Sequence, residues 1–191
     1  MVLRKIAQIG HPILRQTASE VPREEITQPR FRQLVSELIE TMRDAHGAGL
    51  AATQIYEPWQ VCVMEVGENP RYPYKPKLPL TVLFNPVIEP LSDERIESYE
   101  GCLSVPNLRG VVQRWARVRV TGYDAEGAPF EREVAGITAA TFQHEVDHLF
   151  GRLFVDRVED PSTLTTWDQF SRFREAEFRA YVEATVARYG S

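Results

Sequence analysis

The 191-residue chain is 43% hydrophobic and 26% charged, and its formal net charge is −5. These values predict a globular protein with a substantial core, and we expect a single domain over residues 1–191. Basic and acidic residues are interspersed, which argues against direct binding of nucleic acid, and no apolar run approaches the length of a membrane span. The start, Met1–Lys5, lacks the apolar stretch of a signal peptide, so a cytoplasmic protein is expected.

The first elements along the chain are short, apart from one helix. Gly10–Pro12 predicts a turn before a short helical piece at Ile13–Arg15, and we expect His11 in that turn to be a capping or solvated side chain. Residues 30–45 predict a helix, because their apolar side chains recur at intervals of three and four.

Gly47 and Gly49 follow this helix, and Gln54 lies shortly after them. The spacing does not match a dinucleotide-binding loop. One interpretation is a flexible helix end. The other is a backbone that passes close to a ligand, where side chains would clash, with the amide of Gln54 in the same space.

The middle of the chain reads as strands, and the end as helices. Cys62, between valines, is expected to be a core thiol, and Pro86 suggests an edge strand or a strand end. The predicted strands are 60–66, 81–89, 95–99, 111–122, 130–134 and 153–155, with a loop at 69–79, a hairpin turn at 124–127 and one long helix at 167–189.

The most informative stretch is Gln143–His148, which contains the pattern H-E-x-x-H. On a helix, His144 and His148 lie one turn apart on the same face. Two imidazoles so placed can bind one metal ion, and Glu145 beside them can act as a base on a water molecule. Gly151 is the expected C-terminal stop of this helix.

Two histidines need a third ligand, because catalytic sites of the zinc type use three protein ligands and leave one position open. No histidine follows His148, and the best candidate is the upstream Cys102, which lies beside Gly101 in a constrained turn. Two alternatives remain at this point. One is a zinc endopeptidase of another class that uses the same helix, and the other is a structural metal site in a binding module.

Three stretches together resemble the motifs of peptide deformylase, in the order typical of that family. They are Gly47–Gln54, Glu100–Ser104 and Gln143–Leu149, and the likeness extends from about residue 3 to about residue 173. Ala140 is a departure, because many members carry a larger residue there, often arginine. This difference bears on the size of the pocket. His46 is not a fixed feature of the family.

The resemblance implies an α+β fold in which antiparallel strands surround a central metal-binding helix, with an N-terminal and a C-terminal helix outside. It implies a metal-dependent hydrolase that removes the N-terminal formyl group from formyl-methionyl nascent polypeptides and releases formate. The ligands would be Cys102, His144 and His148, holding one divalent ion: iron(II) in the cell, with zinc, nickel or cobalt also accepted.

The resemblance also implies the remaining roles. Glu145 would be the general base, and the Gln54 side chain and the backbone N–H of Leu103 would donate to the developing oxyanion. Gly49 and Gly101 would leave bare backbone where an extended peptide adds as a strand. The expected partners are nascent peptides at the ribosome, and a monomer is expected.

Overall fold

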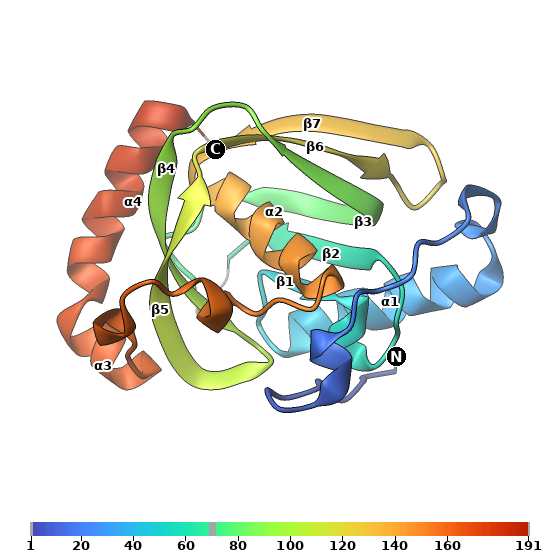
Figure 1. The fold of residues 1–191 in the computed structure, drawn as a ribbon, viewed down its shortest axis with the longest axis horizontal. Coiled ribbons are helices and arrows are strands. Elements are labelled where there is room, and N and C mark those ends of the chain that lie inside the picture. Colours follow the sequence, from blue (N-terminus) through green and yellow to red (C-terminus); the bar gives the residue numbers. More distant parts are fainter. Residues whose placement is uncertain (1, 69–71, 191) are drawn as a thin grey trace.

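Two antiparallel sheets surround one central helix, α2 (Figure 1). The computed structural model describes residues 2–68 and 72–190. The larger sheet has the order β1-β2-β3-β6-β7, and the smaller one pairs β4 with β5. The strands are β1 (Gly49–Ala51), β2 (Val61–Val66), β3 (Leu78–Pro90), β4 (Arg95–Cys102), β5 (Val105–Trp115), β6 (Arg117–Tyr123) and β7 (Pro129–Ala135). The helices are α1 (Pro29–Asp44), α2 (Gly136–Leu149), α3 (Trp167–Phe173) and α4 (Glu175–Tyr189).

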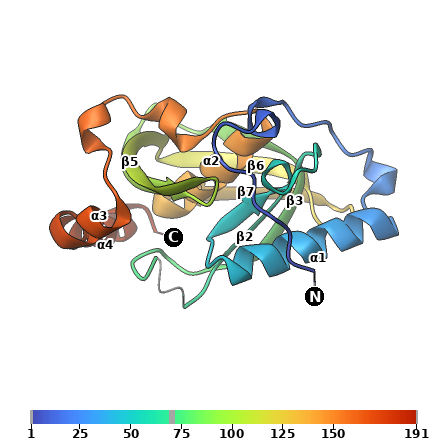
Figure 2. The ribbon, with the colours of Figure 1, turned by 90° about the horizontal axis from the view of Figure 1, so that it is seen from below.

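This arrangement confirms the expected α+β fold. Seen from below, α1 covers one face of the larger sheet while α2 lies on the other face (Figure 2). The two C-terminal helices α3 and α4 pack outside, at the end of the molecule formed by β4 and β5. In the described part of the chain, no helix combines the length and the apolarity that crossing a bilayer requires.

Strand β2 shows why the core has two layers. Val61 and Val63 pack toward α1, whereas Cys62 and Met64 pack in the cluster that includes residues of α2. Alternate side chains of a strand point to opposite faces, so a strand covered on both sides is apolar throughout. The prediction of a buried strand with a core thiol at Cys62 is therefore confirmed, with Cys62 fully buried.

The single strand predicted over 111–122 is wrong, because the chain changes sheets within it. Strand β5 pairs with β4, and β6 pairs with β3 and β7. Ala116 lies at the switch: its N–H donates to Glu94 O at 2.9 Å and its carbonyl accepts from Gly136 N at 2.8 Å. Both hydrogen bonds are made outside the strand ladders. The side chains continue to alternate through Ala116, although the strand that the chain pairs with changes there.

Strand β3 passes through the position where the sequence suggested an interruption. Asn85 has a left-handed φ of 49°, and the register with β6 shifts between Phe84 and Val87. This bulge accommodates Pro86, which has no N–H to give to the ladder. The Asn85 side chain hydrogen-bonds both the N–H and the carbonyl of Val21.

Two C-terminal predictions need correction. The strand predicted at 153–155 is a 3-10 turn, Phe154–Arg157, in which the Asp156 carboxylate accepts from Leu153 N at 2.8 Å. The long helix predicted at 167–189 is broken at Arg174 (φ −126°) into α3 and α4. The break lets Phe170 and Phe178 pack together, with ring centroids 6.1 Å apart.

Several local predictions are confirmed. Asp124 caps the turn between β6 and β7, where Gly127 has φ +74°. The piece at Pro12–Arg15 is a 3-10 helix, and His11 caps it by accepting from Ile13 N at 3.2 Å. Helix α2 ends at Leu149, and Gly151 follows at φ +70°. A Cβ at Gly151 would lie 2.6 Å from Arg15 O, so glycine is required there for close approach as well as for its backbone conformation.

Candidate metal centre

Helix α2 is buried on nearly all sides, because strands of both sheets and α4 surround it. His144 and His148 project from the same face, with ring centroids 5.0 Å apart. A helix inside the core holds such side chains in place through packing, which a surface helix does not. The position of α2 between the sheets therefore fixes how the two histidine side chains are oriented.

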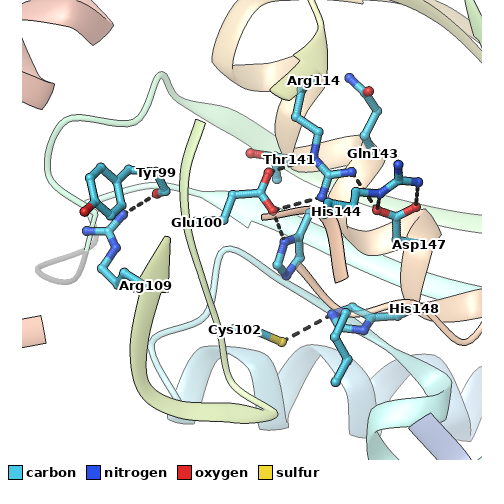
Figure 3. Close-up of polar contacts among 12 residues, drawn as sticks. Tyr99, Glu100, Cys102, Arg109, Arg114, Thr141, Gln143, His144, Asp147 and His148 are labelled. Atoms are coloured by element: carbon cyan, nitrogen blue, oxygen red, sulfur yellow. Dashed lines mark hydrogen bonds and ion pairs between the residues drawn. The ribbon is translucent and has the colours of Figure 1, made fainter. Parts of the chain in front are cut away.

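The third candidate ligand, Cys102, is the last residue of β4. Its Sγ lies 3.3 Å from His148 Nε2, and the ligand atoms of Cys102, His144 and His148 all lie within 4.8 Å of one another (Figure 3). One thiolate and two imidazoles suit divalent iron, cobalt, nickel or zinc. Three protein ligands leave a position open for water or substrate, as in catalytic sites.

His144 is oriented by a buried ionic network. Its Nδ1 lies 2.8 Å from Glu100 Oε2, which leaves Nε2 as the ligand atom. Glu100 in turn accepts two hydrogen bonds from Arg114, at 2.8 and 2.9 Å, and Arg114 donates to Asp147 at 2.6 Å (Figure 3). Asp147 also pairs with Arg157. The chain Glu100–Arg114–Asp147 therefore connects β4, β5 and α2 around the site.

The protein groups of the site shift one another's pKa. Burial raises the pKa of the Cys102 thiol, but the charges and hydrogen bonds of His148 and His144 outweigh it and place that pKa well below its usual range. Burial lowers the pKa of His144, yet Glu100 and Cys102 raise it to about 10. The site thus favours a thiolate, the form in which cysteine binds a metal, and metal binding would release the proton from His144.

Glu145 lies directly beside the glycines of the first motif. A Cβ on Gly49 would lie 2.4 Å from the Glu145 carboxyl carbon, so only glycine leaves space for this carboxylate. Burial raises the pKa of Glu145, while His144 and His148 lower it. Its Oε2 is buried without a hydrogen-bond partner among the described residues. An unpaired buried oxygen with a raised pKa is typical of a carboxylate that exchanges protons in a reaction.

Gln54 is held rigidly next to Cys102. Its Oε1 accepts from Ala51 N at 2.8 Å, and its Nε2 donates to Ser104 Oγ at 3.0 Å and toward Cys102 Sγ at 3.5 Å. The backbone N–H of Ser104 also points at that sulfur, at 3.4 Å. The amide group of Gln54 therefore lies beside the Cys102 sulfur, and its hydrogen bonds with Ala51 and Ser104 fix its orientation.

A pocket opens beside these groups. It is lined by residues of all three motifs, including Gly49, Gln54, Gly101, Leu103 and Glu145, and by Ala140, Thr141, Tyr72 and Lys75. Ala140 thus faces the pocket, as its place one turn before His144 suggested. Gly101 is covered on its side-chain face, where a Cβ would lie 3.0 Å from Trp167. His46 and His11 are not among the pocket residues.

The structure brings together all eight site residues expected from the sequence, and adds others that the sequence analysis missed. Glu100 and Asp147 lie inside the motifs, and that position was the usable signal for both. Arg114 lies on the same strand face as the buried Val112 and Ala116, so a charge on an apolar face was the available signal there. Ser104 is the last residue of the second motif, whereas Tyr72 and Lys75 lie outside the motifs and are recognisable only from their place in the fold.

Comparisons with known proteins agree with this site. The family model for polypeptide deformylase matches residues 3–163. Peptide deformylase 1 of Bordetella pertussis is 46% identical over 159 residues, which cover 83% of this chain and 89% of that protein. A peptide deformylase of Leptospira biflexa is 44% identical over 160 residues, again covering 83% and 89%.

Solved structures give the same result. The Met-Ala-Ser-bound class I type b peptide deformylase of Acinetobacter baumannii superposes with a TM-score of 0.79 at 38% identity, covering 82% of this chain and 99% of that one. The peptide deformylase of Thermotoga maritima superposes with a TM-score of 0.74 at 31% identity, covering 84% and 100%.

The fold and the Cys-His-His site define a metal-dependent hydrolase. The chain belongs to the peptide deformylase family, and its activity is the removal of N-formyl groups. This result excludes the two alternatives left open by the sequence, a zinc endopeptidase of another class and a structural metal site. The family match ends at residue 163, short of the expected limit near residue 173, so α3 and α4 lie outside it.

Proposed function

We propose that residues 1–191 act as a single catalytic domain that deformylates formyl-methionyl nascent polypeptides, releasing formate and a free amine. The observation that carries the proposal is the buried cluster of Cys102, His144 and His148 with the Glu145 carboxylate beside it. The solved Acinetobacter baumannii relative carries Met-Ala-Ser, the product sequence of such a reaction.

The sheet edges support binding of an extended peptide. Within the described residues, strand β1 has a neighbour on one side only, β2, and β4 is paired only with β5. Both strands contribute to the pocket, through Gly49 and Gly101. Free backbone groups on such edges are the usual partners of a peptide that binds as an added strand. In this proposal the substrate backbone lies between β1 and β4.

The chemistry follows from the groups at the pocket. A divalent ion held by Cys102, His144 and His148 would supply Lewis-acid chemistry and would lower the pKa of a water molecule bound to it to about 7. Glu145 accepts the proton of the attacking water and later delivers it to the leaving amine. Gln54 Nε2 and the backbone N–H of Leu103 donate to the oxyanion of the tetrahedral intermediate, and one such donor contributes about 3–4 kcal/mol.

The metal used in the cell, the compartment and the oligomeric state belong to the same proposal. We take iron(II) as the metal in the cell, with zinc, nickel and cobalt as functional substitutes, since the donor set accepts all four. The protein acts as a cytoplasmic monomer on peptides emerging from the ribosome, without binding nucleic acid itself. The interspersed charges of the chain support the last point.

The direct test uses formyl-Met-Ala-Ser and acetyl-Met-Ala-Ser with protein loaded anaerobically with iron(II). Formate release from the formyl peptide, without cleavage of the acetyl peptide or of casein, is the expected result. Cleavage of casein without formate release would contradict the proposal.

A further inference from the structure

Lys75 brings a positive charge to the pocket beside the metal centre. Its Nζ donates to Thr141 Oγ1 at 3.1 Å and lies 4.9 Å from the centre of the Tyr72 ring. Thr141 itself is buried, and Lys75 is half-buried. The ammonium is thus anchored to α2 one helical turn from the ligand His144.

This ammonium has no carboxylate partner. Among the described residues, no Asp or Glu lies within ion-pair distance of Lys75. Thr141 Oγ1 donates its own hydrogen to Ile137 O at 3.2 Å, so it meets Lys75 as an acceptor and satisfies one N–H of three. Burial lowers the pKa of Lys75 to about 8, and it outweighs the charges of Glu100 and Glu145, which act from a longer distance and raise that pKa. A partly buried charge without a directly paired carboxylate is costly, and such groups occur at sites that bind a ligand.

The position of Lys75 indicates which part of a substrate it can meet. Lys75 and Thr141 line the catalytic pocket, and on their other side both face Val66, Leu78 and Ile137 across a narrow gap that is too small for a water molecule. They therefore form a wall between the reaction site and the core. With the formyl group at Glu145 and the metal ligands, the nearest variable part of a peptide is its first side chain, and Ala140 leaves space for that side chain to reach the wall.

We propose that Lys75 is a specificity-determining residue that recognises a hydrogen-bond acceptor at the end of the first side chain. Methionine sulfoxide has the length of methionine and carries a strong oxygen acceptor at the sulfur, so formyl-methionine-sulfoxide peptides are substrates of this site. Norleucine has the same length and no acceptor, and it gains nothing from the ammonium. This inference rests on the proposed function.

The test compares formyl-X-Ala-Ser with X as methionine sulfoxide or norleucine, and measures formate release. We compare kcat/KM for the methionine sulfoxide peptide divided by kcat/KM for the norleucine peptide, both measured on one preparation. The concentration of metal-loaded, folded enzyme cancels in this ratio. Lys75→Met removes the charge at nearly constant volume. It should lower the ratio about tenfold or more, as expected for loss of a hydrogen bond to a charged group, mainly through KM.

Two further variants make the result specific. Thr141→Val removes the anchor of the ammonium without adding volume, and should lower the ratio to a smaller extent. Lys77→Met removes an exposed lysine two residues away and should leave the ratio unchanged. An unchanged ratio in Lys75→Met, or an equal fall in Lys77→Met, would overturn the inference. If the wild type releases formate from neither peptide nor from formyl-Met-Ala-Ser, the proposed function fails and the inference with it.

Discussion

Glu145 and Gly49 illustrate how single residues make this site work. The glycine leaves space that the carboxylate occupies, since a Cβ there would overlap it at 2.4 Å. The sequence suggested a close approach of backbone to substrate at this glycine, and the structure identifies a second reason, the approach of the Glu145 carboxylate itself. Burial then raises the pKa of that carboxyl toward the range in which a general base operates.

Glu145→Gln should retain a full equivalent of metal and lose most of kcat. The substitution keeps the shape of the side chain and removes its basicity, and general-base catalysis contributes about 10²–10⁴-fold. Metal content and formate release are measured on the same preparation. Glu183→Gln, an exposed change on α4, serves as the control. Near wild-type turnover of Glu145→Gln would show that another group takes the proton.

At the scale of elements, the buried network joins β4, β5 and α2. Glu100 comes from β4, Arg114 from β5, and both His144 and Asp147 from α2. Burial raises the pKa of Glu100, but Arg114 and His144 outweigh it and hold that pKa far below its usual range. The network therefore orients a metal ligand and holds three elements together through charge.

The pH dependence of stability follows from this depressed pKa. The carboxylate of Glu100 stays ionised in the folded state at pH values where an unfolded glutamate, with a pKa of about 4.3, is protonated. Its contribution is present above that pH and is lost as the pH falls through and below it. Thermal denaturation of the metal-free protein should show wild type losing more stability from pH 5.5 to pH 3 than Glu100→Gln loses. This window lies below both the folded-state pKa of His144, about 10, and its unfolded value of about 6.5, so His144 stays protonated throughout.

At pH 7, Glu100→Gln should be destabilised by about 3–5 kcal/mol, because it leaves Arg114 buried with one of its two partners removed. Glu133→Gln, which removes one exposed partner of Arg119, should leave the melting temperature nearly unchanged, because exposed ion pairs contribute little to stability. Parallel curves of melting temperature against pH for wild type and Glu100→Gln would contradict the argument.

At the scale of the whole molecule, the metal ligands span the two layers. Cys102 belongs to the smaller sheet, whereas the helix that carries His144 and His148 packs on the larger one. A bound ion would therefore cross-link the two sheets through α2. Cys62, the other cysteine, lies in the core between β2 and α2, and burial raises the pKa of its thiol well above the usual value.

The two serine variants should consequently fail in different ways. Cys102→Ser replaces a soft anionic ligand with a weak one, and should lose metal affinity and most activity. Cys62→Ser places a hydroxyl in an apolar cluster at a cost of about 1–3 kcal/mol, and should lower the melting temperature while keeping metal and specific activity. The readouts are metal content, melting temperature and turnover. Loss of metal in Cys62→Ser but not in Cys102→Ser would mean that the third ligand is misassigned.

The sequence by itself determined the features that depend only on neighbours within a few residues. The spacing of His144 and His148, the turn at Asp124 and the stop at Gly151 are local, and the helix period or the turn geometry is enough to predict them. Cys102 was the best remaining third ligand because no histidine follows His148, and the resemblance of whole motifs then supplied the roles of Cys102 and Gln54. Nothing local brings a strand end and a loop to a helix more than forty residues away.

Only the tertiary structure decided the rest. The change of sheets at Ala116 is invisible in the alternation of side chains, because both sheets require the same alternation. The ion pairs of Arg114 and the contact of Lys75 with Thr141 join residues 14, 33 and 66 positions apart. Such contacts depend on the path of the chain between them, which local periodicity does not record. The contact between Lys75 and Thr141 at the pocket is for this reason a property of the fold. The sequence shows both residues but not that they meet.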